Sequence, residues 1–165
     1  MASFKVLNTN HTSFTVSNLE RTVAFFRDAL GFEVVSQAPR DPKIISQVTG
    51  IEGAHVMIAY VRGPGHYLEL IEYLGPEDRS RVVPRPCDVG FAHVAFDVDD
   101  IDAAIAAAGG HEIRPISDPA TIDKGPNAGG KVAYLRDPDG ITIEFIQPPR
   151  HHEQGMDQGM DESVI

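Results

Sequence analysis

An internal repeat constrains the fold of this chain more than any other feature of its sequence. Residues 11–19 align one for one with residues 93–101, and each copy starts with a histidine. Residues 65–71, Gly-His-Tyr-Leu-Glu-Leu-Ile, align in the same way with residues 140–146, Gly-Ile-Thr-Ile-Glu-Phe-Ile. Such self-similarity indicates a duplicated structural unit. The chain is therefore predicted to contain two copies of one module, which opens with a histidine strand and closes with a glutamate strand.

The hydrophobic pattern predicts the same order of elements in both modules. Alternating apolar residues indicate strands, apolar residues at helical spacing indicate one helix after the first strand, and Ser17 with Glu20 forms a capping-box pattern at its start. The predicted fold class is α+β, with two tandem βαβββ modules that form a curved, cup-shaped mixed sheet with helices outside. The predicted boundaries are 8–74 for the first module, 75–89 for a linker, 90–148 for the second module and 149–165 for a disordered tail.

Composition narrows the classes of partner. The chain has 165 residues and a formal net charge of -10, which disfavours nucleic acid and anionic membranes because both attract clustered positive charge. No apolar run approaches the roughly 20 residues that cross a bilayer, and the first residues do not resemble a signal peptide. A single cysteine, Cys87, excludes an internal disulfide and favours a cytoplasmic location.

Strand parity places the repeated polar residues on one face. His11 and His93 lie on the strand face opposite the apolar residues that follow them and would pack on a helix, and Glu69 and Glu144 alternate with apolar neighbours. A lone strand histidine is usually an ordinary hydrogen-bonded residue, but duplication and matched glutamates favour a shared site. Two imidazoles and two carboxylates suit a divalent metal such as Zn, Ni, Co, Mn or Fe(II). Open positions on such a metal allow a substrate to chelate through two adjacent oxygens.

The order histidine, glutamate, histidine, glutamate in two βαβββ modules resembles the vicinal oxygen chelate superfamily, over residues 8–148. The run Tyr-Leu-Arg-Asp-Pro-Asp-Gly at 134–140, followed by Glu144, resembles its last hairpin. The resemblance implies the metal ligands His11, Glu69, His93 and Glu144. Among its members, the four-ligand set resembles that of glyoxalase I, whereas the related epimerases usually carry glutamine at the position of Glu69. Extradiol dioxygenases and fosfomycin-resistance enzymes use three ligands.

This resemblance implies a divalent-metal-dependent lyase or isomerase of the glyoxalase type, which commonly forms a homodimer. Its substrate would be a small molecule with vicinal oxygens, such as an α-hydroxy carbonyl, a hemithioacetal or a β-keto acyl thioester. A carboxylate would move a proton through an enediolate. Glu69 or Glu144 is the candidate base, and Glu52, before the third strand, is a reserve candidate that is more simply explained as a solvated loop residue.

Three other functions remain open from the sequence. One is an acyl-CoA epimerase of the methylmalonyl-CoA epimerase type, in which Glu52 would act as base. Another is a non-catalytic protein that binds a drug or other small molecule in the cup, as the resemblance to the antibiotic-sequestering members of the superfamily implies. The third is an Fe(II) oxygenase, which would need one of the four ligands to be displaced. The sequence leaves open whether glutathione or coenzyme A is involved and whether the site lies within one chain.

Overall fold

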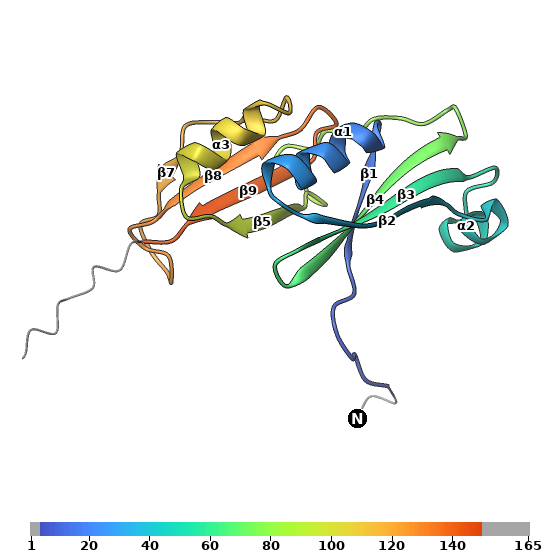
Figure 1. Ribbon diagram of the computed structural model, residues 1–165, viewed down its shortest axis with the longest axis horizontal. Helices are drawn as coiled ribbons and strands as arrows, with labels where there is room; N and C mark the ends of the chain where they lie inside the picture. The colour runs from blue at the N-terminus through green and yellow to red at the C-terminus, as the bar shows by residue number, and fades with distance from the viewer. Residues whose placement is uncertain (1–3, 150–165) are drawn as a thin grey trace, which may run out of the picture.

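The computed structural model describes residues 4–149, and these residues form an α+β protein. Their strands are divided between two mixed sheets, one for each copy of the repeat, with a helix packed on one face of each sheet (Figure 1). The predicted α+β class with two βαβββ modules is confirmed, and each module builds a sheet of its own. Residues 150–165 of the predicted disordered tail lie outside the described residues.

The first module forms a four-stranded sheet from β1 (Thr12–Val16), β2 (Glu33–Pro39), β3 (His55–Gly63) and β4 (His66–Gly75). The strand order is β1-β4-β3-β2. β1 runs parallel to β4, whereas β3 is antiparallel to both of its neighbours. In this register Ser13 lies opposite Glu69, so the residue before β1, His11, is beside the same part of β4.

The second module repeats this topology with β5 (His93–Asp97), β6 (Arg114–Pro115), β8 (Lys131–Arg136) and β9 (Thr142–Gln147), in the order β5-β9-β8-β6. A short additional strand, β7 (Ala120–Thr121), pairs with β8. β5 runs parallel to β9 and sets Ala95 opposite Glu144, which matches the pairing of Ser13 with Glu69. The two sheets therefore hold their repeated histidines and glutamates in the same register.

Three α-helices and one π-helical turn complete the described fold: α1 (Leu19–Ala24), the π-turn η1 (Phe25–Ala29), α2 (Pro42–Thr49) and α3 (Ile101–Gly109). Asn18, not Ser17, caps α1, because its side chain accepts the backbone N–H of Arg21 at 2.9 Å. The predicted capping box is thus wrong by one residue. The Ser17 hydroxyl donates instead to Asp139 of the second module. Asp100 caps α3, because its side chain accepts the backbone N–H groups of Asp102 and Ala103 at 3.0 Å.

The π-turn lets two adjacent aromatic residues point inward. Phe25 and Phe26 are 1% and 2% exposed. A π-turn adds a residue to the helical turn and so shifts the face that the following residues present. Phe26 packs against Phe32 and Phe96, whereas Phe25 lies edge-on to His111 of the second module. The helix spacing in the sequence predicts Phe26 as a core residue but gives no sign that Phe25 is equally buried.

Each sheet has one covered face and one open face. Leu68, Leu70, Ile143 and Phe145 point toward the helices and are at most 2% exposed. The residues between them along the strands, which include Glu69 and Glu144, point the other way and are only partly buried. Burying the apolar stripes of both sheets under α1, η1 and α3 accounts for the core, and it leaves the polar face free for a site.

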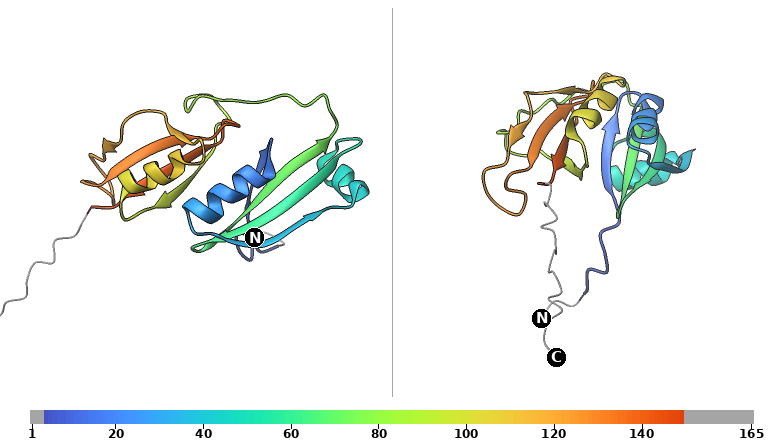
Figure 2. Two further views of the ribbon diagram at one scale, coloured as in Figure 1. Left: turned by 45° about the horizontal axis from the view of Figure 1, so that its top comes forward. Right: turned by 60° about the vertical axis from the view of Figure 1, so that its left-hand side comes forward.

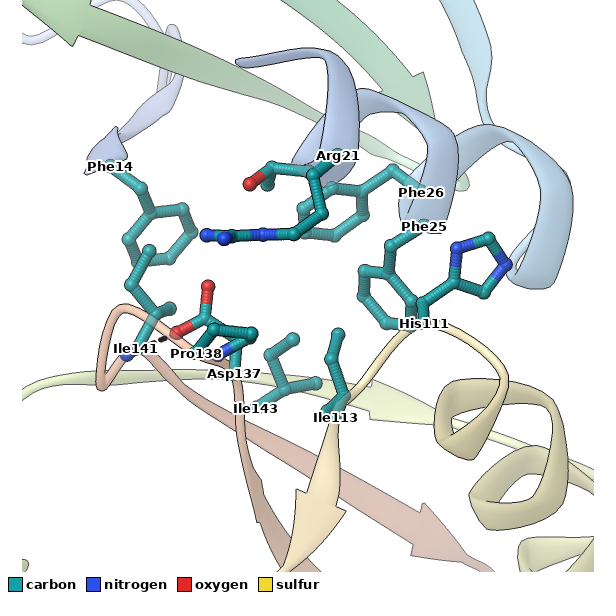
Figure 3. A pocket seen from close by; sticks show the side chains of 11 residues that line it. Phe14, Arg21, Phe25, Phe26, His111, Ile113, Asp137, Pro138, Ile141 and Ile143 are labelled. Atoms are coloured by element: carbon teal, nitrogen blue, oxygen red, sulfur yellow. Dashed lines mark hydrogen bonds between the residues drawn. The ribbon is translucent and has the colours of Figure 1, made fainter. Parts of the chain in front are cut away.

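The two modules meet where α1 and η1 lie against the hairpin between β8 and β9 (Figure 3). Apolar side chains from both modules meet in this contact. The Asp139 side chain, 7% exposed, accepts the backbone N–H of Ser17 at 2.8 Å and pairs with Arg21 at 2.7 Å and with Arg81 at 3.0 Å. This carboxylate therefore ties the first strand, the first helix and the linker to the second module.

Replacing Asp139 with asparagine is expected to lower the free energy of unfolding by about 2 kcal/mol at pH 7, because hydrogen bonds to a charged group are lost. Burial alone raises the pKa of Asp139, but the bonds from Ser17 and the guanidinium groups of Arg81 and Arg21 outweigh it and hold the pKa below 3.8. A carboxyl with a lowered pKa stabilises the fold at pH values above its ordinary pKa. This stabilisation is lost as the pH falls through the lowered pKa. The difference between variant and wild type should therefore shrink in acid.

Chemical denaturation of both proteins at pH 7 and at pH 3 measures this effect. Asp28→Asn is the matched control, because the Asp28 side chain is 48% exposed and its ion-pair partner among residues 4–149 is its neighbour Arg27. An exposed pair of this kind contributes little to stability, because solvent screens the two charges. Equal stability of Asp139→Asn and Asp28→Asn would show that the contact between the modules does not depend on this carboxylate.

The segment between the sheets crosses from the end of β4 to the second module along the end of β1 (Figure 2). It is held to the β8–β9 hairpin by a hydrogen bond from Arg136 Nη2 to the Pro84 carbonyl at 2.9 Å, in addition to the pair between Arg81 and Asp139. None of the helices among residues 4–149 is long and apolar enough to cross a membrane.

Candidate metal centre

The first candidate pair, His11 and Glu69, comes together on the open face of the first sheet. The Nε2 atom of His11 lies 3.3 Å from Oε2 of Glu69. The side chains are 31% and 12% exposed, so that the carboxylate is mostly shielded while the imidazole remains accessible. Glu69 is on β4, and His11 directly precedes the neighbouring parallel strand β1, so that the register of these two strands brings the two side chains together.

Two neighbours fix the orientation of this pair. The Nδ1 atom of His11 lies 2.6 Å from the amide oxygen Oδ1 of Asn10, an acceptor, so that Nδ1 donates to it and Nε2 is the nitrogen that faces Glu69. The hydroxyl of Tyr60 donates to Oε1 of Glu69. Metal-binding histidines and carboxylates usually have such outer partners, which hold the ligand atoms in place.

The second candidate pair repeats the arrangement in the second sheet. The Nε2 atom of His93 lies 2.9 Å from Oε2 of Glu144, and the side chains are 34% and 14% exposed. Phe91 stacks on the imidazole of His93 with ring centroids 5.8 Å apart, and Tyr134 lies beside it at 5.1 Å. Tyr60 likewise lies 5.7 Å from the imidazole of His11, so the two pairs differ in the stacked Phe91 of the second and the hydrogen-bonded Asn10 of the first.

The two tyrosines occupy equivalent positions but have different contacts. Tyr60 lies opposite Glu69 in the strand register, and Tyr134 lies opposite Glu144. Burial, the hydrogen bond to Glu69 and its negative charge raise the pKa of Tyr60 to about 12. Burial and the charge of Glu144 also raise the pKa of Tyr134. Both phenols stay protonated at neutral pH and are available as hydrogen-bond donors.

The spacing within each pair fits adjacent ligands of one metal ion. Two donors in neighbouring positions of an octahedron, each about 2.1 Å from the metal, lie about 3 Å apart. The observed separations of 3.3 Å and 2.9 Å bracket this value. One nitrogen and one oxygen from each pair make a donor set that suits a borderline divalent ion. These separations are also those of a direct His–Glu contact, so the spacing alone does not assign a metal.

Within one chain the two halves do not converge. The structure brings His11 to Glu69 and His93 to Glu144, but no three histidine, cysteine, aspartate or glutamate side chains in residues 4–149 gather into a group able to hold a metal. The pairs belong to separate sheets (Figure 1). Both pairs remain open on the face that the helices leave uncovered, where further ligands have access.

Glu52 lies apart from both pairs. It is exposed in the turn that precedes β3. The first residue of β3, His55, pairs with Gly75 at the far end of β4, six residues beyond Glu69. At about 3.3 Å per residue, this corresponds to about 20 Å along the strand. Within a single chain, Glu52 and Glu69 are therefore not neighbours.

Sequence reasoning missed the residues that support the ligands. The repeat contains a signal for the tyrosines, because Ala-Tyr-Val-Arg at 59–62 aligns with Ala-Tyr-Leu-Arg at 133–136. Strand parity then puts Tyr60 and Tyr134 on the face of the glutamates that they oppose. Asn10 carries no comparable signal, since its equivalent in the second module is Ala92.

Comparison with known proteins identifies the fold and the family. Residues 8–145 match the model of the Glyoxalase/Bleomycin resistance protein/Dioxygenase superfamily, which is most of the chain. The chain belongs to this superfamily. The resemblance predicted from the repeated histidines and glutamates is thereby confirmed. A glyoxalase family protein from Bacillus cereus has a similar structure, with a TM-score of 0.78 and 24% sequence identity, covering 90% of this chain and 99% of that protein.

Two curated members of the superfamily are enzymes. A 2-epi-5-epi-valiolone epimerase from an Actinomyces species is 35% identical over 147 residues, which cover 85% of this chain and 79% of that protein. A lactoylglutathione lyase from Haemophilus influenzae is 27% identical over 148 residues, which cover 83% of this chain and 90% of that protein. This superfamily member is thus related to an epimerase and a lyase over nearly its whole described length.

Proposed function

We propose that the protein is a divalent-metal-dependent enzyme that removes and returns a proton on a carbon next to two adjacent substrate oxygens. The observation that carries this proposal is the pair of matched His–Glu contacts, at 3.3 Å and 2.9 Å, on the open faces of two equivalent sheets. The residues that would hold the metal are His11, Glu69, His93 and Glu144. When bound, the metal would supply Lewis-acid stabilisation of negative charge on the substrate oxygens.

The four ligands would be supplied by two copies of the chain. Each chain presents two half-sites that do not meet within it, and both are accessible. A two-fold dimer that faces the first pair of one copy with the second pair of the other builds two identical sites at once. In a homodimer of this kind each of the four His–Glu pairs faces a complementary pair, whereas a monomer has two pairs and no complete site.

The carboxylates in this site would have different tasks. Glu69 already accepts the hydroxyl of Tyr60, which holds it in its position as a ligand. Glu144 has no such bond from Tyr134 among the contacts of the described residues, and its contact is with His93. Glu144 is therefore the better candidate for the base that takes the proton and gives an enediolate of the substrate. Glu69 is the second candidate, and Glu52 could act only from another copy.

The two related enzymes support this type of chemistry and suggest two forms of it. Epimerisation returns the proton to the opposite face of the same carbon, as the name of the 35% identical relative implies for its own substrate. A glyoxalase-type isomerisation, which the lactoylglutathione lyase relative favours, returns it to the neighbouring carbon. Both begin with the same proton removal, so a test of that step covers both.

Exchange of substrate hydrogen with solvent deuterium tests the proposal. Small α-hydroxy carbonyls, hemithioacetals and acyl thioesters are incubated with the protein in D₂O, and incorporation at the carbon beside the oxygens is followed by NMR. Exchange that stops when a chelator removes the metal and returns when the metal is restored is the expected result. Tight stoichiometric binding of a small molecule, without exchange and without any effect of the chelator, would instead indicate a non-catalytic binding protein.

The bond from Tyr60 to Glu69 gives a separate prediction. Tyr60→Phe is expected to weaken metal binding by about 10- to 100-fold, the usual effect of losing an outer partner of a ligand. Tyr134→Phe is the matched control, because its hydroxyl makes no such bond to Glu144 and it should change the affinity less. Competition with a fluorescent chelator measures both variants. Equal affinities in wild type and Tyr60→Phe would show that this phenol does not position the ligand.

A further inference from the structure

A hollow lies on the open face of the first sheet, at the opposite end of β1 from His11. It has a volume of about 370 Å³ and is formed where β1, β4 and the linker meet. Thr15 and Tyr73 reach it from the sheet, because they lie on the same strand faces as Ser13 and Glu69. Arg79, Ser80 and Arg81 close it from the linker. The proposed chemistry does not use any of these residues.

The linker is fixed beside this hollow. Arg81 pairs with the mostly buried Asp139 at 3.0 Å, and Arg136 donates to the Pro84 carbonyl at 2.9 Å. Val83 packs so closely on the hairpin that a Cβ atom added at Gly140 would lie 3.1 Å from its methyl groups. These contacts with the second module fix the part of the linker that carries Arg79 and Arg81.

The charge balance in the hollow is positive. Asp139 is the one carboxylate among its lining residues, and its oxygens already accept bonds from Ser17, Arg21 and Arg81. Arg79 donates to the Pro76 carbonyl and forms no ion pair with any residue in the described part of the chain. Glu77 and Asp78 precede it but do not line the hollow. An excess of guanidinium charge here contrasts with the net charge of -10 of the chain.

Guanidinium groups and hydroxyls together are the donors that bind oxyanions. Arginine presents a planar fork of N–H groups that matches the oxygens of a phosphate or a carboxylate. The hydroxyls of Thr15, Tyr73 and Ser80 add neutral donors around it. A hollow of this size has room for such a group and part of the molecule that carries it.

We propose that this hollow is an oxyanion-binding subsite that holds the far end of the substrate, a phosphate or carboxylate group. Tyr73 lies four residues beyond Glu69 on the same face of β4, which corresponds to about 13 Å along the strand. The subsite therefore selects extended substrates, with their adjacent oxygens at one end and an anionic group at the other. This assignment of substrate class rests on the proposed function, but the anion site itself does not require the metal.

Titration with inorganic phosphate and, separately, with succinate tests the subsite. The full-length protein is first stripped of metal with a chelator, so that the anions have no metal to bind. Binding is followed by calorimetry and by NMR shifts of the amides of Thr15 and Ser80. Arg79→Ala is expected to weaken binding by about tenfold or more, because Arg79 supplies a charge-assisted contact and no ion pair of the fold. Tyr73→Phe, which removes only a hydroxyl, should weaken it less.

Arg85→Ala is the matched control, because Arg85 belongs to the same linker but pairs with Asp88 outside the hollow. It should bind both anions as the wild type does. Phosphate binding without succinate binding would assign a phosphate, and the reverse would assign a carboxylate. Binding of neither anion, or equal binding by wild type and Arg79→Ala, would overturn the subsite.

The double variant His93→Ala/Glu144→Ala separates this inference from the proposed function. It should retain anion binding, since neither residue lines the hollow. If the wild type holds metal and exchanges substrate protons but Arg79→Ala leaves anion binding unchanged, the subsite alone is wrong. If anion binding depends on Arg79 but no metal is bound, the proposed function is wrong and the anion site stands.

Discussion

Replacing Glu144 with glutamine is expected to lower kcat by about 10²- to 10⁴-fold, the range that a general base contributes. Glutamine keeps an oxygen that can still face His93, but its amide cannot take a proton. Metal content should therefore stay near the wild-type level while proton exchange is lost. Steady-state kinetics and metal analysis of the same preparation measure both quantities.

Two variants make this result specific. Glu69→Gln should lower kcat less than Glu144→Gln, because the Tyr60 hydroxyl already engages the Glu69 carboxylate. Glu33→Gln is the neutral control, since Glu33 is 59% exposed and pairs with Arg62 on the surface of β2. A larger loss in Glu69→Gln than in Glu144→Gln would assign the base to the first module. Wild-type turnover in Glu69→Gln and in Glu144→Gln would show that another residue is the base.

Two inactive variants are expected to restore activity to each other. One chain carries His11→Ala/Glu69→Ala and lacks the first pair, and the other carries His93→Ala/Glu144→Ala and lacks the second. Each should be inactive as a homodimer. In a mixed dimer one site receives both intact pairs and the other receives none, so about half of the wild-type activity should return.

Co-expression with two different affinity tags and sequential purification isolates the mixed dimer. The tagged homodimers, purified in the same way, show the background activity of each variant. If every site lies within one chain, the mixed dimer contains no complete site and should be as inactive as its parents. Restored activity therefore distinguishes sites shared between chains from sites within one chain.

The repeat predicted much of this molecule because the fold is built from two copies of a strand register. Strand parity placed Glu69 and Glu144 on the open faces, and the structure sets each beside the histidine of its own module. The family followed from the same residues. These features depend on the alternation of apolar and polar residues along each strand, which is visible in the sequence and which determines the pairing register of neighbouring strands.

Other features depend on contacts that are distant in the sequence. Ser17 has the pattern of a helix cap, but Asp139, 122 residues away, takes up its hydroxyl and Asn18 caps the helix instead. The burial of Phe25 depends on a π-turn, which the spacing of apolar residues does not indicate. The position of Glu52, far from Glu69, follows from the length of β3 and β4 and not from its place before a strand.

Elemental analysis of protein purified without added metal or chelator tests the central claim most directly. The wild type and the variant His93→Ala/Glu144→Ala are compared, with Glu33→Gln as a control for substitution itself. About one transition metal per chain in the wild type and the control, and little in the double variant, is the expected result for a site that needs both pairs. A double variant that holds as much metal as the wild type would contradict the assignment of the ligands. So would a wild type that contains no metal and takes up none of Zn, Ni, Co, Mn or Fe(II).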